Sequence, residues 1–127
     1  MTNHLTNQLG KDFKEEEIEG VKSSYQESTQ TADYEPNFET LLDAGNNLIW
    51  GVGYKLADAT ESAALDNPDV KFGIVDYAYE QVPENLVSIL FKDEQSSFLV
   101  GYIAGKTTET NKVGFVGGIE GDVIKAF

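Results

Sequence analysis

The fold of this chain is indicated most clearly by residues 46–54, NNLIWGVGY. Its centre, Leu48–Trp50, is a short apolar run with turn-forming residues on both sides. Such a run is typical of a strand buried on both faces, as in a parallel sheet. Gly51 and Gly53 then allow the backbone to turn tightly and to approach whatever lies beyond the strand. Because ligands bind at the carboxyl ends of strands in an open α/β sheet, the stretch predicts one wall of a binding crevice.

Strand and helix patterns alternate along the rest of the chain. Further strands are predicted at Val21–Glu27, Val70–Ala78, Leu86–Phe91 and Lys112–Gly118. Helices are predicted over residues 3–17, 34–44, 55–65 and 94–106, and from residue 121 onward. Strands that alternate with helices of this length form βα units, so we expect an α/β fold with a mostly parallel sheet.

Two of the predicted helices have recognisable ends. Asp33 is a good N-cap for the helix before the opening stretch, Pro36 is tolerated in its first turn, and Gly45 ends it. Asp93 caps the helix over residues 94–106. The stripe of that helix expected to be buried consists of Phe98, Leu99, Tyr102 and Ile103.

The composition indicates a globular protein of one domain. The chain has 127 residues, 40% of them hydrophobic, which suffices for one real core and not for two full domains. A formal net charge of -13 argues against nucleic-acid binding and against attraction to anionic membrane surfaces. The sequence contains no cysteine, so a disulfide framework, a thiolate metal site and a lipid-anchor cysteine are all excluded within it. With no visible signal peptide either, we expect a soluble chain as it stands.

Asp76 is the leading candidate for a ligand contact. It ends a strand of the buried type and is expected to face the crevice. An ionised carboxylate there can accept two hydroxyl hydrogen bonds, which suits the cis-diol of a ribose. The alternative is that Asp76 caps a turn or pairs with a neighbouring amide.

The glycines of the opening stretch are the second candidate contact. Gly51 and Gly53 are followed by Tyr54, and we expect this turn to bring backbone and the tyrosine ring near a ligand. The spacing does not match a dinucleotide fingerprint, because Leu56 stands where a third glycine would be needed. Trp50 could stack on a purine, but core packing is the favoured interpretation.

No combination of residues predicts catalysis. The single histidine, His4, lies near the terminus, so no Ser-His-Asp set can be assembled, and no lysine follows a glycine loop as in a Walker motif. The sequence therefore predicts neither an enzyme nor a resident cofactor or metal.

Several motifs in fixed order resemble one known family. They are Asp33–Asn37, Leu48–Tyr54, Phe72–Asp76, Phe98–Ala104 and Lys112–Gly118. From about Val21 onward the chain resembles the basic membrane protein family of bacterial lipoproteins, which are nucleoside-binding receptors of ABC importers. The resemblance implies a type I periplasmic-binding-protein fold, in which two Rossmann-like lobes close on a nucleoside. It also implies that Asp76 contacts the ligand, that an ABC permease is a partner, and that the receptor is anchored outside the cell membrane.

The chain departs from the family pattern at both ends. Family members are more than twice as long and open with a lipid-anchored cysteine and a first strand that are absent here. Gln95 stands where a glutamate is expected. We therefore expect a single incomplete lobe: an N-terminal helix over residues 1–20, a body over 21–111, and a segment over 112–127 that in the family leads into the second lobe.

The absent first strand leads to a specific hypothesis. In the doubly wound order 2-1-3-4-5 that strand is central, and an empty central slot would leave buried backbone groups unpaired at about 1–3 kcal/mol each. Lys112–Gly118 has the pattern of a family first strand. It is hypothesised to fill the slot, either within one chain or by exchange between two chains as a homodimer.

The predicted function follows from this combination. The chain is expected to be part of a solute-binding component of an ABC importer, resembling purine-nucleoside receptors, with weak or no binding alone. The alternative is a non-binding structural protein that self-associates as a strand-exchanged dimer.

Overall fold

The computed structural model describes residues 19–118 and 120–125. The helix predicted over residues 3–17 lies outside the described residues. None of the described helices is long and apolar enough to cross a membrane.

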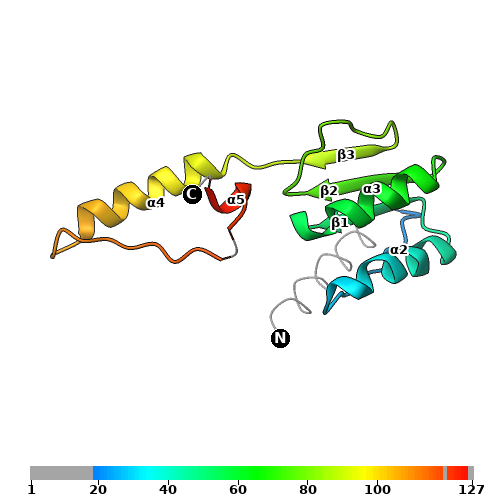
Figure 1. The fold of residues 1–127 in the computed structure, drawn as a ribbon, viewed down its shortest axis with the longest axis horizontal. Coiled ribbons are helices and arrows are strands. Elements are labelled where there is room, and N and C mark those ends of the chain that lie inside the picture. The colour runs from blue at the N-terminus through cyan, green and yellow to red at the C-terminus, as the bar shows by residue number, and fades with distance from the viewer. Residues whose placement is uncertain (1–18, 119, 126–127) are drawn as a thin grey trace.

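Three parallel strands form the sheet (Figure 1). They are β1 (Leu48–Val52), β2 (Lys71–Val75) and β3 (Leu86–Ile89), in the spatial order β1-β2-β3. β1 pairs with β2 from Leu48 opposite Lys71 to Val52 opposite Val75, and β2 pairs with β3 from Phe72 opposite Leu86. The prediction of an α/β fold with a parallel sheet is confirmed.

The helices connect and follow these strands. They are the 3-10 turn η1 (Thr31–Asp33), α2 (Tyr34–Asp43), the 3-10 turn η2 (Tyr54–Leu56), α3 (Ala57–Asp66), α4 (Asp93–Thr107) and α5 (Asp122–Lys125). α2 ends as predicted at Gly45, whose φ of 78° is the left-handed conformation that glycine adopts most readily. α2 and α3 pack against each other, and α3 packs on β2.

The core lies between one face of the sheet and the helices α2 and α3. Its buried apolar members are Phe38, Ile49, Ala57, Ala59, Ala64, Phe72, Ile74 and Leu86. Because side chains alternate between the faces of a strand, this set uses every second residue of each strand. Gly51 belongs to the same face, and a β-carbon there would lie 2.5 Å from Oγ1 of the buried Thr60. α3 therefore packs on β1 at a distance that only glycine permits.

The opposite face of the sheet is open. On β1 the residues Leu48, Trp50 and Val52 point away from the core and are exposed, Val52 by 72%. The prediction that this strand is buried on both faces is therefore wrong, because the described part of the chain provides helices on one face only. Trp50 is 37% exposed, and its ring covers Gly73, where a β-carbon would come within 2.3 Å of it. It packs on the sheet rather than inside the core.

Asp33 makes a different cap from the one predicted. Its carboxylate accepts hydrogen bonds from the backbone nitrogens of Thr29 (2.9 Å) and Gln30 (3.1 Å), which precede it, and no side-chain bond caps α2. The side-chain amide of Gln30, followed by the other donors, lowers the pKa of Asp33 to about 2. The residue thus stabilises the turn that enters α2.

Two predicted strands are absent from the described residues. Val21–Glu27 has no strand pairing; Ser24 Oγ contacts Oδ1 of Asn46 at 3.3 Å, and Asn37 Nδ2 donates to the Glu27 carbonyl at 3.4 Å. Lys112–Gly118 is exposed chain without sheet pairing, with Val116 97% exposed. The hypothesis that this segment fills the central slot within its own chain is therefore wrong. β1 is paired on one side only in the portion of the chain that the structure covers.

α4 also differs from the prediction in its burial. The helix forms close to the expected residues, but Asp93, predicted as its cap, is its first residue, with Lys92 in the cap position and no side-chain cap. The helix extends away from the sheet (Figure 1), and its stripe of Phe98, Leu99, Tyr102 and Ile103 is exposed. Phe98 is 70% exposed. Periodicity identified the helix correctly, whereas none of the described residues supplies a surface that buries its stripe.

Candidate functional site

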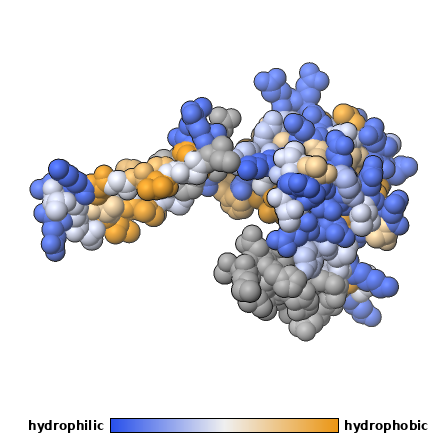
Figure 2. All heavy atoms as spheres, turned by 60° about the horizontal axis from the view of Figure 1, so that its bottom comes forward, coloured by the Kyte–Doolittle hydropathy of each residue, from blue (hydrophilic) through white to orange (hydrophobic). Residues whose placement is uncertain are grey.

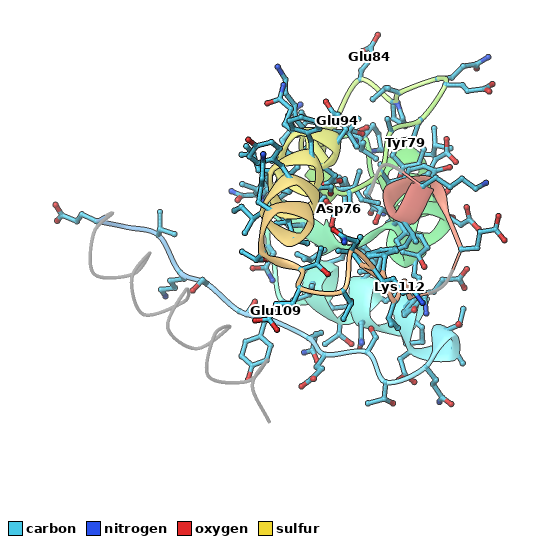
Figure 3. The ribbon with its side chains drawn as sticks, turned by 90° about the vertical axis from the view of Figure 1, so that its left-hand side faces the viewer. Asp76, Tyr79, Glu84, Glu94, Glu109 and Lys112 are labelled. Carbon is cyan, nitrogen blue, oxygen red and sulfur yellow. The ribbon has the colours of Figure 1, made fainter. Side chains whose placement is uncertain are left out.

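The candidate site lies at the carboxyl ends of β1 and β2, the edge that faces the viewer in Figure 3. Val52 is opposite Val75 in the register, so Gly53 and Asp76 follow as neighbours at the ends of adjacent strands. The backbone nitrogen of Gly53 donates to the Val75 carbonyl at 3.2 Å, and that of Asp76 donates to the Ile89 carbonyl at 2.9 Å. The sheet thus fixes the two backbones relative to each other.

Asp76 has an unusual backbone and an available carboxylate. Its φ of 67° lies in the left-handed region, which aspartate tolerates better than most residues. The residue is partly buried, and within residues 19–118 and 120–125 its carboxylate makes no hydrogen bond or ion pair. The alternative that Asp76 caps a turn is therefore not what the structure contains, and both carboxylate oxygens can accept from a ligand.

The two glycines have different surroundings. Gly53 adopts φ 105° with nothing within 4 Å of a hypothetical β-carbon, so it turns the chain at an open position beside Asp76. Gly51 lies instead between β1 and α3, against Thr60. Tyr54 begins η2 directly after this turn and is exposed. The structure thus brings Gly53, Tyr54 and Asp76 to one edge, whereas Gly51 lies one residue deeper in the core.

Two tyrosines that the sequence analysis did not select lie next to Asp76. Tyr77 is exposed, and its ring meets that of Tyr79 edge to face, with centroids 4.9 Å apart. Tyr79 donates its hydroxyl to the carbonyl of Ala57, the first residue of α3, at 2.7 Å. Burial, with a contribution from Glu61, raises the pKa of Tyr79 to about 12. The run Asp-Tyr-Ala-Tyr at a strand end was the signal in the sequence, since aromatic rings beside an acceptor are typical of ligand edges.

The two hollows that the structure shows most clearly lie away from this edge. A hollow of about 40 Å³ lies between Gln26, Ser28, Asn37 and Trp50, and another of about 410 Å³ lies between α2 and α3. Neither is lined by Asp76, Gly53 or Tyr54. The described residues also contain no group of three or more His, Cys, Asp or Glu side chains arranged to hold a metal ion.

These features define a class of protein. Among the described residues, the carboxyl edge of a parallel sheet carries a carboxylate that makes no hydrogen bond, a glycine turn and exposed tyrosines, and in open α/β folds this edge is where ligands bind. The particular family is shown by comparison: residues 8–127 match the model of "Bmp: ABC transporter substrate-binding protein PnrA-like". The chain belongs to this family, whose members bind substrates for ABC transporters and are not enzymes.

Relatives and a solved structure agree with this assignment. The chain is 41% identical to Basic membrane protein A1 of Borrelia garinii subsp. bavariensis, over 92% of this chain and 38% of the relative. It is 48% identical to the CD4+ T-cell-stimulating antigen of Listeria monocytogenes, over 82% of this chain and 29% of the relative. A crystal structure of a fragment from Peptoclostridium difficile 630, described as a lipoprotein, is similar with a TM-score of 0.60 and 29% identity, covering 84% of this chain and 88% of that one. The chain thus spans less than two fifths of the length of these two curated relatives.

Proposed function

We propose that this chain is the part of a solute receptor that contributes one wall of a purine-nucleoside site. The observation that carries the proposal is the carboxylate of Asp76, which is partly buried at the carboxyl edge of the sheet and makes no hydrogen bond among the described residues. The resemblance described above, in which this position contacts the ligand, and membership of the substrate-binding family support it.

The chemistry of the edge fits the ribose end of a nucleoside. A cis-diol offers two hydroxyl donors at the spacing of the two oxygens of one carboxylate, and such charge-assisted bonds are about twice as strong as neutral ones. Gly53 leaves open space beside Asp76, because nothing lies within 4 Å of its hypothetical β-carbon. The exposed rings of Tyr54 and Tyr77 supply apolar surface next to the acceptor.

One wall alone is expected to bind weakly. Ligand sites that bind tightly bury about 70–90% of the ligand surface. A nucleoside on this open edge keeps most of one side in water. In the complete receptor, a second lobe would close on the ligand and the receptor would deliver it to an ABC permease, from an anchored position outside the membrane.

Titration calorimetry with adenosine, guanosine and inosine tests the proposal. We expect dissociation constants in the millimolar range, which correspond to a binding free energy of about -4 kcal/mol. Such weak binding requires concentrated protein and ligand. The 2′-deoxynucleosides and the Asp76→Asn variant should both weaken binding, since each removes part of the diol-to-carboxylate interaction. If Asp76→Asn and the parent bind equally, or if 2′-deoxyadenosine binds as well as adenosine, the role of Asp76 is refuted.

A second candidate function is self-association without ligand. Two observations favour it: β1 is paired on one side only among the described residues, and the apolar segment Lys112–Gly118 is exposed. An open strand edge and an exposed apolar segment outside the sheet on the same chain favour strand exchange between two chains. Flat calorimetric traces together with a stable dimer on size-exclusion chromatography would favour this function over ligand binding.

A further inference from the structure

Two apolar surfaces of similar length are exposed on the same chain. The first, the open sheet face, consists of Leu48, Trp50, Val52, Val87 and Ile89. The second, the α4 stripe, consists of Phe98, Leu99, Tyr102 and Ile103. Figure 2 shows hydrophobic residues gathered along the arm that carries α4. Apolar surface of this extent is seldom left in water by soluble proteins, and it marks sites of association.

The open sheet face has the shape of a helix-binding surface. The register places Trp50, Gly73 and Val87 in one row across the three strands, and Val52, Val75 and Ile89 in the next. The ring of Trp50 covers Gly73, where a side chain would otherwise project from the middle of the face. Five residues of strand span about 17 Å and the 15 residues of α4 about 22 Å, so one helix can cover the length of the sheet.

The α4 stripe is available on the appropriate side of its helix. At about 100° per residue, Phe98, Leu99, Tyr102 and Ile103 fall within an arc of roughly 140°. The partly buried residues of the helix, Asp93, Ser97 and Ala104, lie on the opposite side. The contacts that partly bury the opposite side of α4 therefore leave its apolar stripe exposed for docking.

The hinge between β3 and α4 determines which sheet the helix can reach. Only Leu90, Phe91 and Lys92 join the two elements, and none of them is glycine. In the structure they carry the chain onward from the end of β3, away from its own sheet (Figure 1). Docking of α4 on its own sheet requires a reversal of the chain within these three residues. Docking on the sheet of another copy keeps the hinge as it is.

From this geometry we propose that α4 of one chain docks by its apolar stripe on the open sheet face of a second copy, and that the second copy does the same in return. Such a reciprocal exchange forms a closed two-fold dimer, in which each stripe and each open sheet face is buried once. Short hinge loops favour this outcome over closure within one chain. The occupant of the open sheet face is thus a second copy of this chain, and the proposal is independent of nucleoside binding.

The charge of the chain gives the dimer a specific salt dependence. Each copy carries a formal net charge of -13, so two copies repel each other at low ionic strength. Salt shortens the range of this repulsion from about 30 Å at 0.01 M to about 10 Å at 0.1 M, while it leaves apolar contact intact. The dimer fraction is therefore expected to rise with salt, opposite to an interface held by ion pairs.

The absence of native cysteine allows a clean cross-linking test. Tagged Val87→Cys protein and untagged Leu99→Cys protein are mixed in denaturant, refolded together at moderate salt, and treated with a short bismaleimide. One cysteine is then on the open sheet face and the other on the α4 stripe, so a tagged-to-untagged covalent dimer forms only between chains. Exchange predicts this heterodimer on the order of tenfold above a mixture that uses Val100→Cys, because proximity raises the effective concentration. Val100 is exposed but lies about 130° round the helix from the centre of the stripe.

Three further measurements separate the outcomes. The Val87→Cys/Leu99→Cys double variant, cross-linked at low protein concentration, yields a monomer if α4 closes on its own sheet, and that result would overturn the proposal. A sizing profile that stays monomeric at all salt concentrations would overturn it as well. Ile103→Glu should abolish the dimer and make the urea midpoint independent of protein concentration, and it should unfold like the parent at concentrations where the parent is monomeric, because α4 contributes no residue to the core of the single lobe.

Discussion

Asn85 is expected to hold together three elements of the lobe, and its replacement by alanine should be costly. Its side-chain nitrogen lies 2.9 Å from the carbonyl oxygen of Ala64, 3.0 Å from that of Asn67 and 2.9 Å from that of Val70. These carbonyls belong to the end of α3 and to the turn that leads into β2, while Asn85 itself precedes β3. The residue is 8% exposed. The last carbonyls of a helix have no partner within it and need a side chain or water as hydrogen-bond donor. The Asn85 side chain supplies that donor at the end of α3.

The magnitude follows from the number of donors. The side-chain amide of Asn85 has two hydrogens for three acceptors. Its removal therefore loses about two hydrogen bonds of roughly 1 kcal/mol each. A buried carbonyl left without a partner costs about a further 1–3 kcal/mol. We expect Asn85→Ala to reduce the free energy of unfolding by about 3 kcal/mol, a large part of the roughly 5–15 kcal/mol of a domain. The backbone carbonyl of Asn85, which accepts from Phe72 nitrogen at 2.8 Å, is unaffected by the change.

Urea unfolding, followed by circular dichroism and by fluorescence of the single tryptophan, Trp50, measures this loss. With a slope of about 1–3 kcal/mol per molar urea, the midpoint should fall by roughly 1–3 M. Asn47→Ala is the matched control: Asn47 is exposed, and its change should stay within about 0.5 kcal/mol. A loss at Asn85 no larger than at Asn47 would refute the structural role assigned to this side chain.

Two further predictions concern the packing of α3 and the entry to α2. Gly51→Ala should destabilise the lobe by about 1–3 kcal/mol, because the new methyl group meets Thr60 Oγ1 at 2.5 Å. In a double-mutant cycle, adding Thr60→Ala should recover part of that loss. If the losses of the two single variants are strictly additive, the clash is contradicted. The pKa of Asp33 is lowered from 3.8 to about 2 in the folded state. The ionised carboxylate therefore contributes its full stabilisation of the fold above pH 4, and this contribution is lost as the pH falls from about 4 to 2. Asp33→Asn should remove that part of the acid dependence in unfolding curves measured between pH 2 and 6, and an unchanged pH profile would show that the carboxylate is not bonded as described.

Much of the fold could be predicted from local sequence. The strands at Leu48, Val70 and Leu86 and the helices over 34–44, 55–65 and 94–106 all occur, within a few residues, because hydrophobic period and end signals act over short distances. Asp76, Gly53 and Tyr54 lie at one edge, as expected where the carboxyl ends of parallel strands meet, and their role as ligand contacts stays a prediction. The contribution of Tyr77 and Tyr79 was missed, because a loop after a strand has no period from which to predict it.

Other features depended on partners distant in the sequence. Asp33 was predicted to cap the helix that follows it, but its carboxylate instead accepts from the two residues that precede it by three and four positions. Val21–Glu27 alternates like a strand and yet has no strand pairing in the structure. Alternation specifies which side chains share a face, and it does not specify whether another backbone is present to accept the hydrogen bonds.

The opening stretch, residues 46–54, illustrates what each source of information determined. The sequence by itself determined that Leu48–Trp50 is a strand and that the chain belongs to an α/β class, because these depend on short-range patterns. The predicted glycine turn falls at Gly53 only, since the strand continues through Gly51 and Val52. Only the tertiary structure decided that Ile49 and Gly51 face the core whereas Trp50 and Val52 face outward, and that α4 extends away from the sheet. Burial of a face is a property of two surfaces in contact, and the second surface has no signature in the strand that it covers.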